Sequence, residues 1–110
     1  MSTHSTDLEI DPRFRAGLAR LWQERQADHL ETIGVVCAHL RHEGVDASEA
    51  ANAAHRLAGT LGMFGLPAAS ESARLIEQAL DTDPNGDRGA LLVTANRIRN
   101  DIAGHAIAVD

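Results

Sequence analysis

Apolar residues recur along this chain at intervals of three and four positions, the spacing that places side chains on one face of a helix. The first such pattern follows Asp11 and Pro12, which suit a helix N-cap and a first helical position, and we expect Gly44 at its C′ position. A polar run at residues 23–28 divides the pattern, so it fits either one long helix or a short helix followed by a longer one. Its apolar members are Phe14, Leu18, Leu21, Trp22, Leu30, Ile33, Val36, Cys37 and Leu40.

A second pattern follows Asp46, which forms an acidic variant of a capping box with Glu49. We predict a helix from about residue 47 to residue 64, ended by Gly65. Its apolar residues share one face, so we expect that face in the core. They are Ala50, Ala53, Leu57, Leu61 and Phe64.

Two further helical patterns complete the chain. The first begins at Pro67, which fits the first turn of a helix, and the short connection at residues 65–66 requires it to run antiparallel to the helix before it. Residues 81–86 are rich in turn formers and predict a loop. The apolar positions are Ala69, Ala73, Ile76 and Leu80 before this loop, and Leu91, Ala95, Ile98 and Ile102 after it, continuing toward Ala106 and Val109.

These patterns predict an all-α protein, an antiparallel four-helix bundle with a possible short extra helix at its N-terminal end. We expect residues 11–110 to form one helical domain. Residues 1–10 are polar and lack a helical pattern over a useful length, so we expect a flexible lead there. The composition agrees: 44% of the residues are hydrophobic but only 3% are aromatic, whereas a β-sandwich needs more β-branched and aromatic residues.

Charge and cysteine content narrow the classes of function. The formal net charge of −6 argues against binding to nucleic acid or to an anionic membrane surface, because both need a basic face. Cys37 is the only cysteine, so no disulfide forms within the chain. The sequence shows no signal peptide and no apolar run long enough to span a membrane. We expect a soluble, cytoplasmic and monomeric protein.

The second helical pattern also carries the candidate chemistry. His55 falls on the side opposite the apolar face, where its ring would be exposed. Glycine inside a helix costs roughly 1 kcal/mol relative to alanine, and two glycines on this side suggest that another molecule approaches the backbone closely. A nucleophilic imidazole needs such an open setting if a second protein must reach its ring nitrogen. The small or short polar neighbours of His55 are Ser48, Ala51, Asn52, Gly59 and Gly62.

Cys37, His39 and His42 include side chains that can bind transition metals. Their arrangement on a helix is poor, because His39 and His42 share a face whereas Cys37 lies about 160° around the helix from His39. Cys37 also continues the apolar pattern and is better placed in the core. We therefore expect no metal site from these residues.

The spacing of residues 55–77 resembles the signature of the histidine-containing phosphotransfer (HPt) domains of bacterial two-component phosphorelays. That signature runs His-x-Leu-Lys-Gly, then a hydrophobic–glycine pair, a small residue and an aliphatic–glutamate pair at fixed distances from the histidine. The family's usual lysine is Ala58 here, and the nearest cationic side chain is that of Arg56. The residues that match without gaps are His55, Leu57, Gly59, Phe64, Gly65, Ala73, Ile76 and Glu77.

The resemblance implies a carrier in which His55 accepts a phosphoryl group from an aspartyl phosphate on a receiver domain and passes it to another receiver. Its partners would be response-regulator receiver domains or a hybrid sensor histidine kinase. The receiver would supply Mg²⁺, so the chain would need no cofactor of its own. The sequence contains no P-loop and no glycine-rich nucleotide fingerprint, so we do not expect an autonomous kinase. Receiver docking would involve Ser48, Ala51, Asn52, Arg56, Ala58, Gly59 and Gly62.

Three other functions stay open at this point. A degenerate HPt-like module would bind a receiver without carrying phosphate, and the alanine at position 58 favours it. A helical adaptor outside phosphorelays would explain the bundle but not the exposed face around His55. An enzyme is the weakest alternative, because no paired carboxylates and no Ser or Cys nucleophile beside a base are evident.

Overall fold

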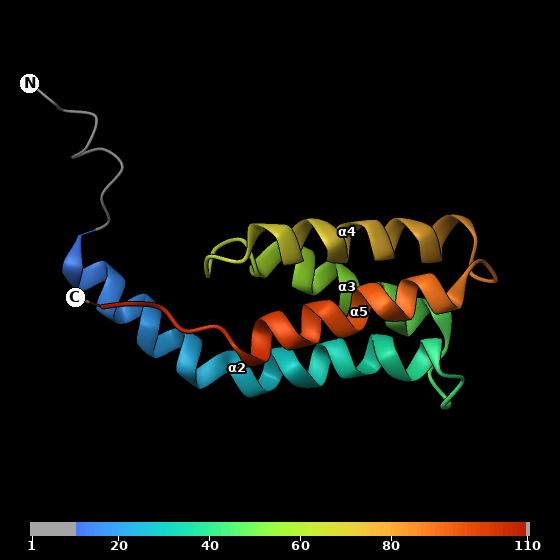
Figure 1. Cartoon of the computed structure of the whole chain (residues 1–110), viewed down its shortest axis with the longest axis horizontal. Coiled ribbons are helices and arrows are strands. Elements are labelled where there is room, and N and C mark those ends of the chain that lie inside the picture. Colours follow the sequence, from blue (N-terminus) through green and yellow to red (C-terminus); the bar gives the residue numbers. More distant parts are fainter. Residues whose placement is uncertain (1–10, 110) are drawn as a thin grey trace, which may run out of the picture.

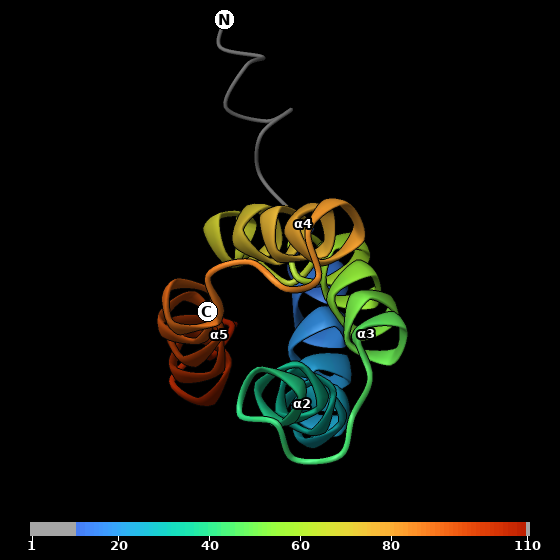
Figure 2. The same ribbon diagram turned by 90° about the vertical axis from the view of Figure 1, so that its right-hand side faces the viewer.

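The computed structural model describes residues 11–109, in which four helices form a bundle (Figure 1). The lead expected at residues 1–10 lies outside the described residues, as does Asp110. The helices pack in a ring, each against the next, around a common core (Figure 2). All regular structure in the described part of the chain is helical, which confirms the predicted all-α bundle. The helices are α2 (Pro12–Leu40), α3 (Ala47–Thr60), α4 (Pro67–Thr82) and α5 (Arg88–Ala103).

The polar run at residues 23–28 does not interrupt α2, which continues through it as one helix of 29 residues. Side chains beside and within this run bind the end of α5. Trp22 Nε1–H donates to His105 O at 3.0 Å, and Gln26 Nε2–H donates to Ile102 O at 2.7 Å. The polar residues near the run thus serve contacts between α2 and α5 rather than a turn, and within residues 11–109 no separate short helix precedes α2.

Three of the four described helices begin where the sequence predicts. The Asp11 carboxylate accepts the Arg13 backbone N–H at 2.8 Å, and the Asp46 carboxylate accepts the Glu49 backbone N–H at 2.8 Å. Pro67 is the first residue of α4. Each carboxylate satisfies a backbone donor that has no partner within the helix, a contact worth about 1 kcal/mol.

The helix that carries His55 ends at Thr60, earlier than predicted, because the chain then tightens into a turn. Leu66 N–H donates to Leu61 O at 3.0 Å and Gly65 N–H to Gly62 O at 3.1 Å, the two bonds of a Schellman motif. Gly65 has a φ of +88°, which glycine adopts without a steric penalty. Gly65 therefore stops the helical path as predicted, but through a tightened turn.

The end of α2 corrects a second prediction. Its closing hydrogen bonds run from His42 N–H to His39 O at 3.0 Å and from Glu43 N–H to Ala38 O at 2.8 Å. This pattern puts His42, not Gly44, at the C′ position. The φ of His42 is +60°, a left-handed conformation in which histidine is commoner than most non-glycine residues.

Eight of the twenty buried hydrophobic residues in the described chain are alanines. Four of the five buried residues of α3 and two of the four of α4 are alanines, so the two backbones can approach each other closely. Cys37 is buried, as predicted. The predicted apolar residues that are buried are Trp22, Ile33, Val36 and Leu40 of α2, Ala50, Ala53, Leu57, Leu61 and Phe64 in and after α3, Ala69, Ala73, Ile76 and Leu80 of α4, and Ala95, Ile98 and Ile102 of α5.

Two predictions about the apolar pattern were wrong. Phe14 belongs to the pattern of α2 but is exposed, because this first part of α2 extends beyond the other three helices (Figure 1). The last helix ends at Ala103, so Ala106 and Val109 do not continue its buried face. No helix in the described part of the chain combines the length and the hydropathy needed to cross a membrane.

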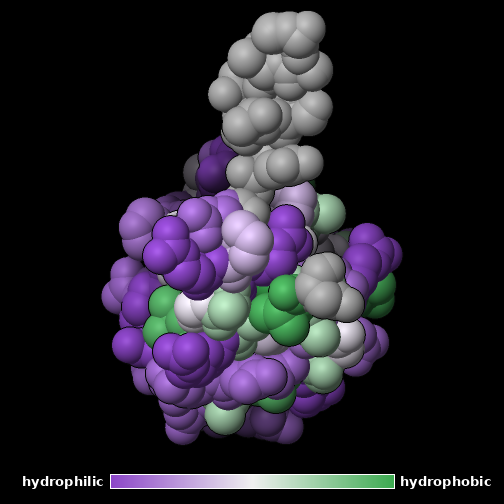
Figure 3. Space-filling model, turned by 90° about the vertical axis from the view of Figure 1, so that its left-hand side faces the viewer, coloured by the Kyte–Doolittle hydropathy of each residue, from purple (hydrophilic) through white to green (hydrophobic). Residues whose placement is uncertain are grey.

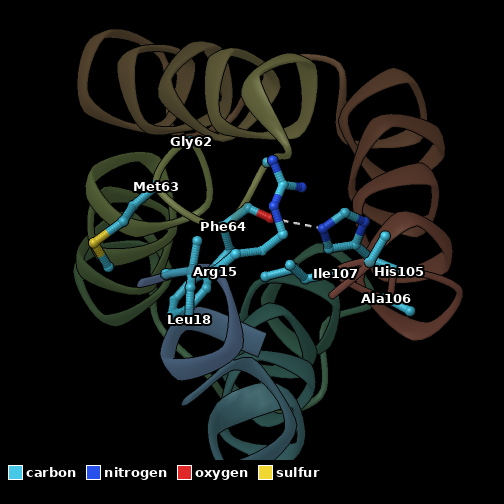
Figure 4. Close-up of a pocket in the computed structure, with 10 residues that line it drawn as sticks. Arg15, Leu18, Gly62, Met63, Phe64, His105, Ala106 and Ile107 are labelled. Carbon is cyan, nitrogen blue, oxygen red and sulfur yellow. Dashed lines mark hydrogen bonds between the residues drawn. The ribbon is translucent and has the colours of Figure 1, made fainter. Parts of the chain in front are cut away.

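Aromatic rings gather where α2, the turn after α3 and the C-terminal segment meet. The ring centroid of Trp22 lies 5.4 Å from that of His29, 5.1 Å from that of Phe64 and 5.2 Å from that of His105. His105 Nε2–H donates to Phe64 O at 2.6 Å (Figure 4). This bond holds the segment after α5 against the turn after α3.

His29 is expected to make the bundle less stable in acid. Burial lowers the pKa of His29 below its ordinary value of 6.5, Asp28 opposes this effect and Arg25 adds to it. The unfolded chain therefore binds this proton at a higher pH than the folded chain does. Above about pH 6.5, His29 is neutral in both states and does not reduce the free energy of unfolding. As the pH decreases through that value, the unfolded chain takes up the proton first and the free energy of unfolding falls.

Urea unfolding at about pH 7.5 and about pH 5 would measure this effect. Wild type should lose more of its free energy of unfolding between the two pH values than His29→Leu, which cannot titrate at this position. Asp28 and Arg25 stay unchanged in both proteins, so the difference isolates the imidazole. Equal losses in the two proteins would show that His29 does not control acid stability.

Candidate functional site

His55 lies near the middle of α3 and points away from the core, as the helical pattern predicts. Its side chain is 73% exposed. The opposite face of α3 is fixed by buried residues such as Ala53 and Leu57, each at most 1% exposed. Burial of that face therefore keeps the imidazole in solvent.

The Glu77 carboxylate on α4 orients this imidazole. Its Oε2 lies 2.9 Å from His55 Nδ1, and the Glu77 side chain is only 23% exposed. An ionised carboxylate can only accept a hydrogen bond, so the contact assigns the proton to Nδ1 and the lone pair to Nε2. The arrangement is an exposed ring nitrogen with a lone pair, held in one tautomer by a carboxylate.

Sequence reasoning assigned no chemistry to Glu77, although the chain contains a signal for its position. Glu77 lies as many residues after Leu66 as His55 lies before it. In two antiparallel helices joined by a short turn, residues equally far from the turn lie side by side. The expected helix pair therefore already implied that these two residues are level with each other.

The predicted docking residues do not all lie on the exposed surface around His55. Ser48, Asn52, Arg56, Gly59 and Gly62 are exposed, and Ala58 is half-buried. Ala51 is only 8% exposed. It belongs to the buried core and offers a partner almost no surface, which argues against a role in docking.

The two glycines near His55 have different settings. A Cβ added to Gly59 would meet no other side chain or distant backbone within 4 Å, so nothing in this chain requires glycine there. Its effect is to leave open space one turn from His55. Gly62 was predicted inside the helix but lies in the turn after it, where a Cβ would come within 3.8 Å of Ser70 Oγ.

Two arginines flank the histidine. Arg56 is exposed and lies about 100° around α3 from His55, on the side away from α4. Arg74 is exposed on α4. We expect it to be level with Ala58, because the two residues are equally far in sequence from Leu66. The Ser70 hydroxyl donates to Ala58 O at 2.5 Å, so α4 packs against this part of α3.

Arg74 is paired with Glu71, and both side chains are about half exposed. One of its hydrogen bonds, from Nε to Glu71 Oε1, measures 3.2 Å. An exposed pair of this kind is worth roughly 0–1 kcal/mol. Arg74 can therefore exchange Glu71 for a stronger anion at little cost.

Cys37, His39 and His42 lie in different settings. His39 is buried and donates its Nδ1–H to Val45 O at 2.7 Å, while His42 is exposed in the turn after α2. Within residues 11–109, no group of three or more His, Cys, Asp or Glu side chains is placed to hold a metal ion. The buried His39 thus fixes the end of α2 instead.

Comparison with known proteins adds one finding. The family model described as "Hpt domain" matches residues 17–104, most of the chain. The match includes His55, Glu77 and all four helices except the first turn of α2. Searches of curated proteins and of solved structures gave no match.

Proposed function

The chain belongs to the Hpt domain family, whose members are phosphocarriers of phosphorelays, and on that premise we propose that His55 Nε2 is the atom that carries the phosphoryl group. A receiver domain with an aspartyl phosphate is the proposed donor, and a second receiver is the acceptor. The hydrogen bond between His55 and Glu77 carries the proposal, because it leaves Nε2 with an exposed lone pair.

The proposed transfer needs one displacement at phosphorus. The lone pair of Nε2 forms the new P–N bond while the P–O bond to the donor aspartate breaks, and the donor regains its carboxylate. The Nδ1 proton stays between His55 and Glu77, so the ring becomes positively charged beside the Glu77 carboxylate. Transfer to the acceptor aspartate reverses these steps. The receiver would hold the Mg²⁺, and this chain contributes the oriented imidazole.

A labelling experiment tests the proposal. The purified chain is mixed with a receiver domain that carries a radioactive aspartyl phosphate, chosen as the receiver that labels wild type fastest in a panel. We expect label on the chain that is labile in acid and stable in alkali, as a phosphorus–nitrogen bond to histidine requires. Binding of the receiver without any label would instead favour the module that docks without carrying phosphate.

Arg74 is expected to assist transfer more than Arg56. The arriving phosphoryl group is negatively charged and lies near the Glu77 carboxylate, so a cation beside it lowers the free energy of the transferred state. Arg74 lies on the same side of His55 as Glu77, whereas Arg56 lies on the opposite flank. A charge-assisted hydrogen bond of about 1–1.5 kcal/mol corresponds to roughly a fivefold to tenfold change in rate.

Initial transfer rates of three variants would measure this difference. Arg74→Gln should be slowed about fivefold to tenfold and Arg56→Gln less than twofold. Glu71→Gln releases Arg74 from its partner and should transfer at least as fast as wild type. A larger loss in Arg56→Gln than in Arg74→Gln would contradict the role given to Arg74.

A further inference from the structure

We infer that this chain binds a small amphipathic carboxylate, a molecule with one carboxylate and a short hydrocarbon chain, in a groove beside its C-terminal segment. The groove lies between the start of α2, the turn after α3 and the segment after α5, and its volume is about 370 Å³. We call it the C-terminal groove. The inference goes beyond the carrier function and does not depend on it. The argument uses the lining residues Arg15, Leu18, Met63, Phe64, His105 and Ile107.

The segment after α5 forms one wall of the C-terminal groove and is held in place by the rest of the fold. His105 O accepts Trp22 Nε1–H at 3.0 Å, and His105 Nε2–H donates to Phe64 O at 2.6 Å. Ile107, two residues further on, packs against the core. These contacts fix the wall without a ligand. The groove is therefore formed before anything binds, as most small-molecule sites are.

Most of the groove lining is apolar. Phe64 is 2% exposed, and Leu18 and Ile107 are half-buried and packed against the core. Figure 3 looks onto this end of the molecule and shows hydrophobic residues across its middle with hydrophilic residues around them. Small-molecule sites usually measure about 300–1,000 Å³, so the groove has room for a hydrocarbon chain of several carbons. The small lining residues that leave this space are Gly62, Gly65, Ala106 and Ala108.

Arg15 supplies the charge that selects the ligand. Figure 4 shows its side chain lying across the groove, between Met63 and His105. Within residues 11–109, no carboxylate forms an ion pair with Arg15 and no acidic residue lines the groove. A guanidinium group matches the planar shape of a carboxylate and can bind both of its oxygens. One cation in an apolar groove therefore favours a single carboxylate attached to an apolar body.

Other classes of ligand fit the C-terminal groove less well. An amine or an amino acid would place its ammonium group where the described residues offer no carboxylate. A nucleotide would bring several phosphate charges to one arginine and bury sugar hydroxyls without hydrogen-bond partners. A bilayer surface would contact the edge of the groove without filling it. The monocarboxylate is the class that satisfies both the charge and the apolar lining.

NMR titration of the full chain with octanoate tests the site. Octan-1-ol is the control that has the chain without the charge, and acetate has the charge without the chain. The backbone amides of Met63, Phe64 and Ile107 should shift with octanoate, as should the indole N–H of Trp22 that donates to His105. We expect a Kd on the order of 1 mM or lower for octanoate. Decanoate should bind several-fold more tightly, and octan-1-ol and acetate at least fivefold more weakly.

Two variants separate the charge from the apolar lining. Arg15→Gln should weaken octanoate binding about fivefold to tenfold and change octan-1-ol binding less than twofold. Arg20→Gln, an exposed change on α2 outside the groove, should alter neither. Ile107→Ser should weaken both ligands about fivefold, whereas Val93→Ser, at a position 60% exposed on α5, should not. Circular dichroism checks that every variant keeps its helix content.

Each outcome has a separate meaning. Equal octanoate affinity in Arg15→Gln and wild type would overturn recognition of the carboxylate, and the absence of shifts at tenfold the expected Kd would overturn the site. Binding to phosphatidylserine vesicles without any response to octanoate would reassign the groove to a membrane contact. His55→Gln should bind octanoate like wild type, so failure of the carrier function and failure of this site are independent results.

Discussion

Replacement of His55 by glutamine is expected to reduce phosphoryl transfer onto this chain to background, a loss of at least about a hundredfold. Glutamine has no ring nitrogen with a lone pair that can form a stable bond to phosphorus. The bundle should stay folded, because the His55 side chain is 73% exposed and substitutions at such positions usually change stability by about 0.5 kcal/mol or less. Label transfer from a phosphorylated receiver, together with circular dichroism, measures both parts of this prediction.

His42→Asn is the matched control for this variant. His42 is exposed in the turn after α2, and its φ of +60° suits asparagine better than most residues. His39 and His105 are poor controls because each donates a ring N–H to a backbone carbonyl that shapes the fold. His42→Asn should be labelled as fast as wild type. Persistent acid-labile label on His55→Gln would move the carrier site to another histidine.

Glu77→Gln is expected to slow phosphoryl transfer by about tenfold to a hundredfold, a loss like that seen when a carboxylate that orients a metal-bound histidine is removed. The amide lacks the negative charge that stabilises the positive ring of phosphohistidine. Its NH₂ group can also donate to Nδ1, which would place the proton on Nε2 and remove the nucleophilic lone pair. Initial rates with the same phosphorylated receiver would measure the loss.

The ring tautomer gives this prediction a second readout. Nitrogen-15 NMR of His55 should show Nδ1 protonated in wild type and a mixture of tautomers in Glu77→Gln. Glu31→Gln, an exposed carboxylate change on α2, should alter neither the rate nor the tautomer. An unchanged rate in Glu77→Gln together with the wild-type tautomer would mean that Glu77 only packs beside His55.

The sequence was sufficient to predict the four described helices, the starts of three of them and most of the core. Periodicity and caps depend on residues close together in the chain, so Asp11, Asp46 and Pro67 could be placed from local chemistry alone. Helix ends were harder to predict. At Gly65 and His42 the end is set by which backbone donors close the last turn, and several nearby residues could have taken that position.

The site was predicted only in part for a related reason. The exposure of His55 follows from the helical pattern of α3 itself. Equal spacing about Leu66 indicates that Glu77 is level with His55, but the hydrogen bond between them and the burial of Ala51 depend on how α4 packs against α3. Phe14 shows the same limit, because its pattern predicts an apolar face but not how far the other helices extend beside it.

The Schellman turn around Gly65 also has a consequence for how this chain can vary over evolution. Turns on a protein surface usually accept insertions and deletions. Here one residue added or lost in a helix between His55 and Glu77 would rotate one of them by about 100° relative to the other. Many substitutions in this helical hairpin can be accommodated, but the number of residues that separates the nucleophile from its carboxylate is expected to stay constant.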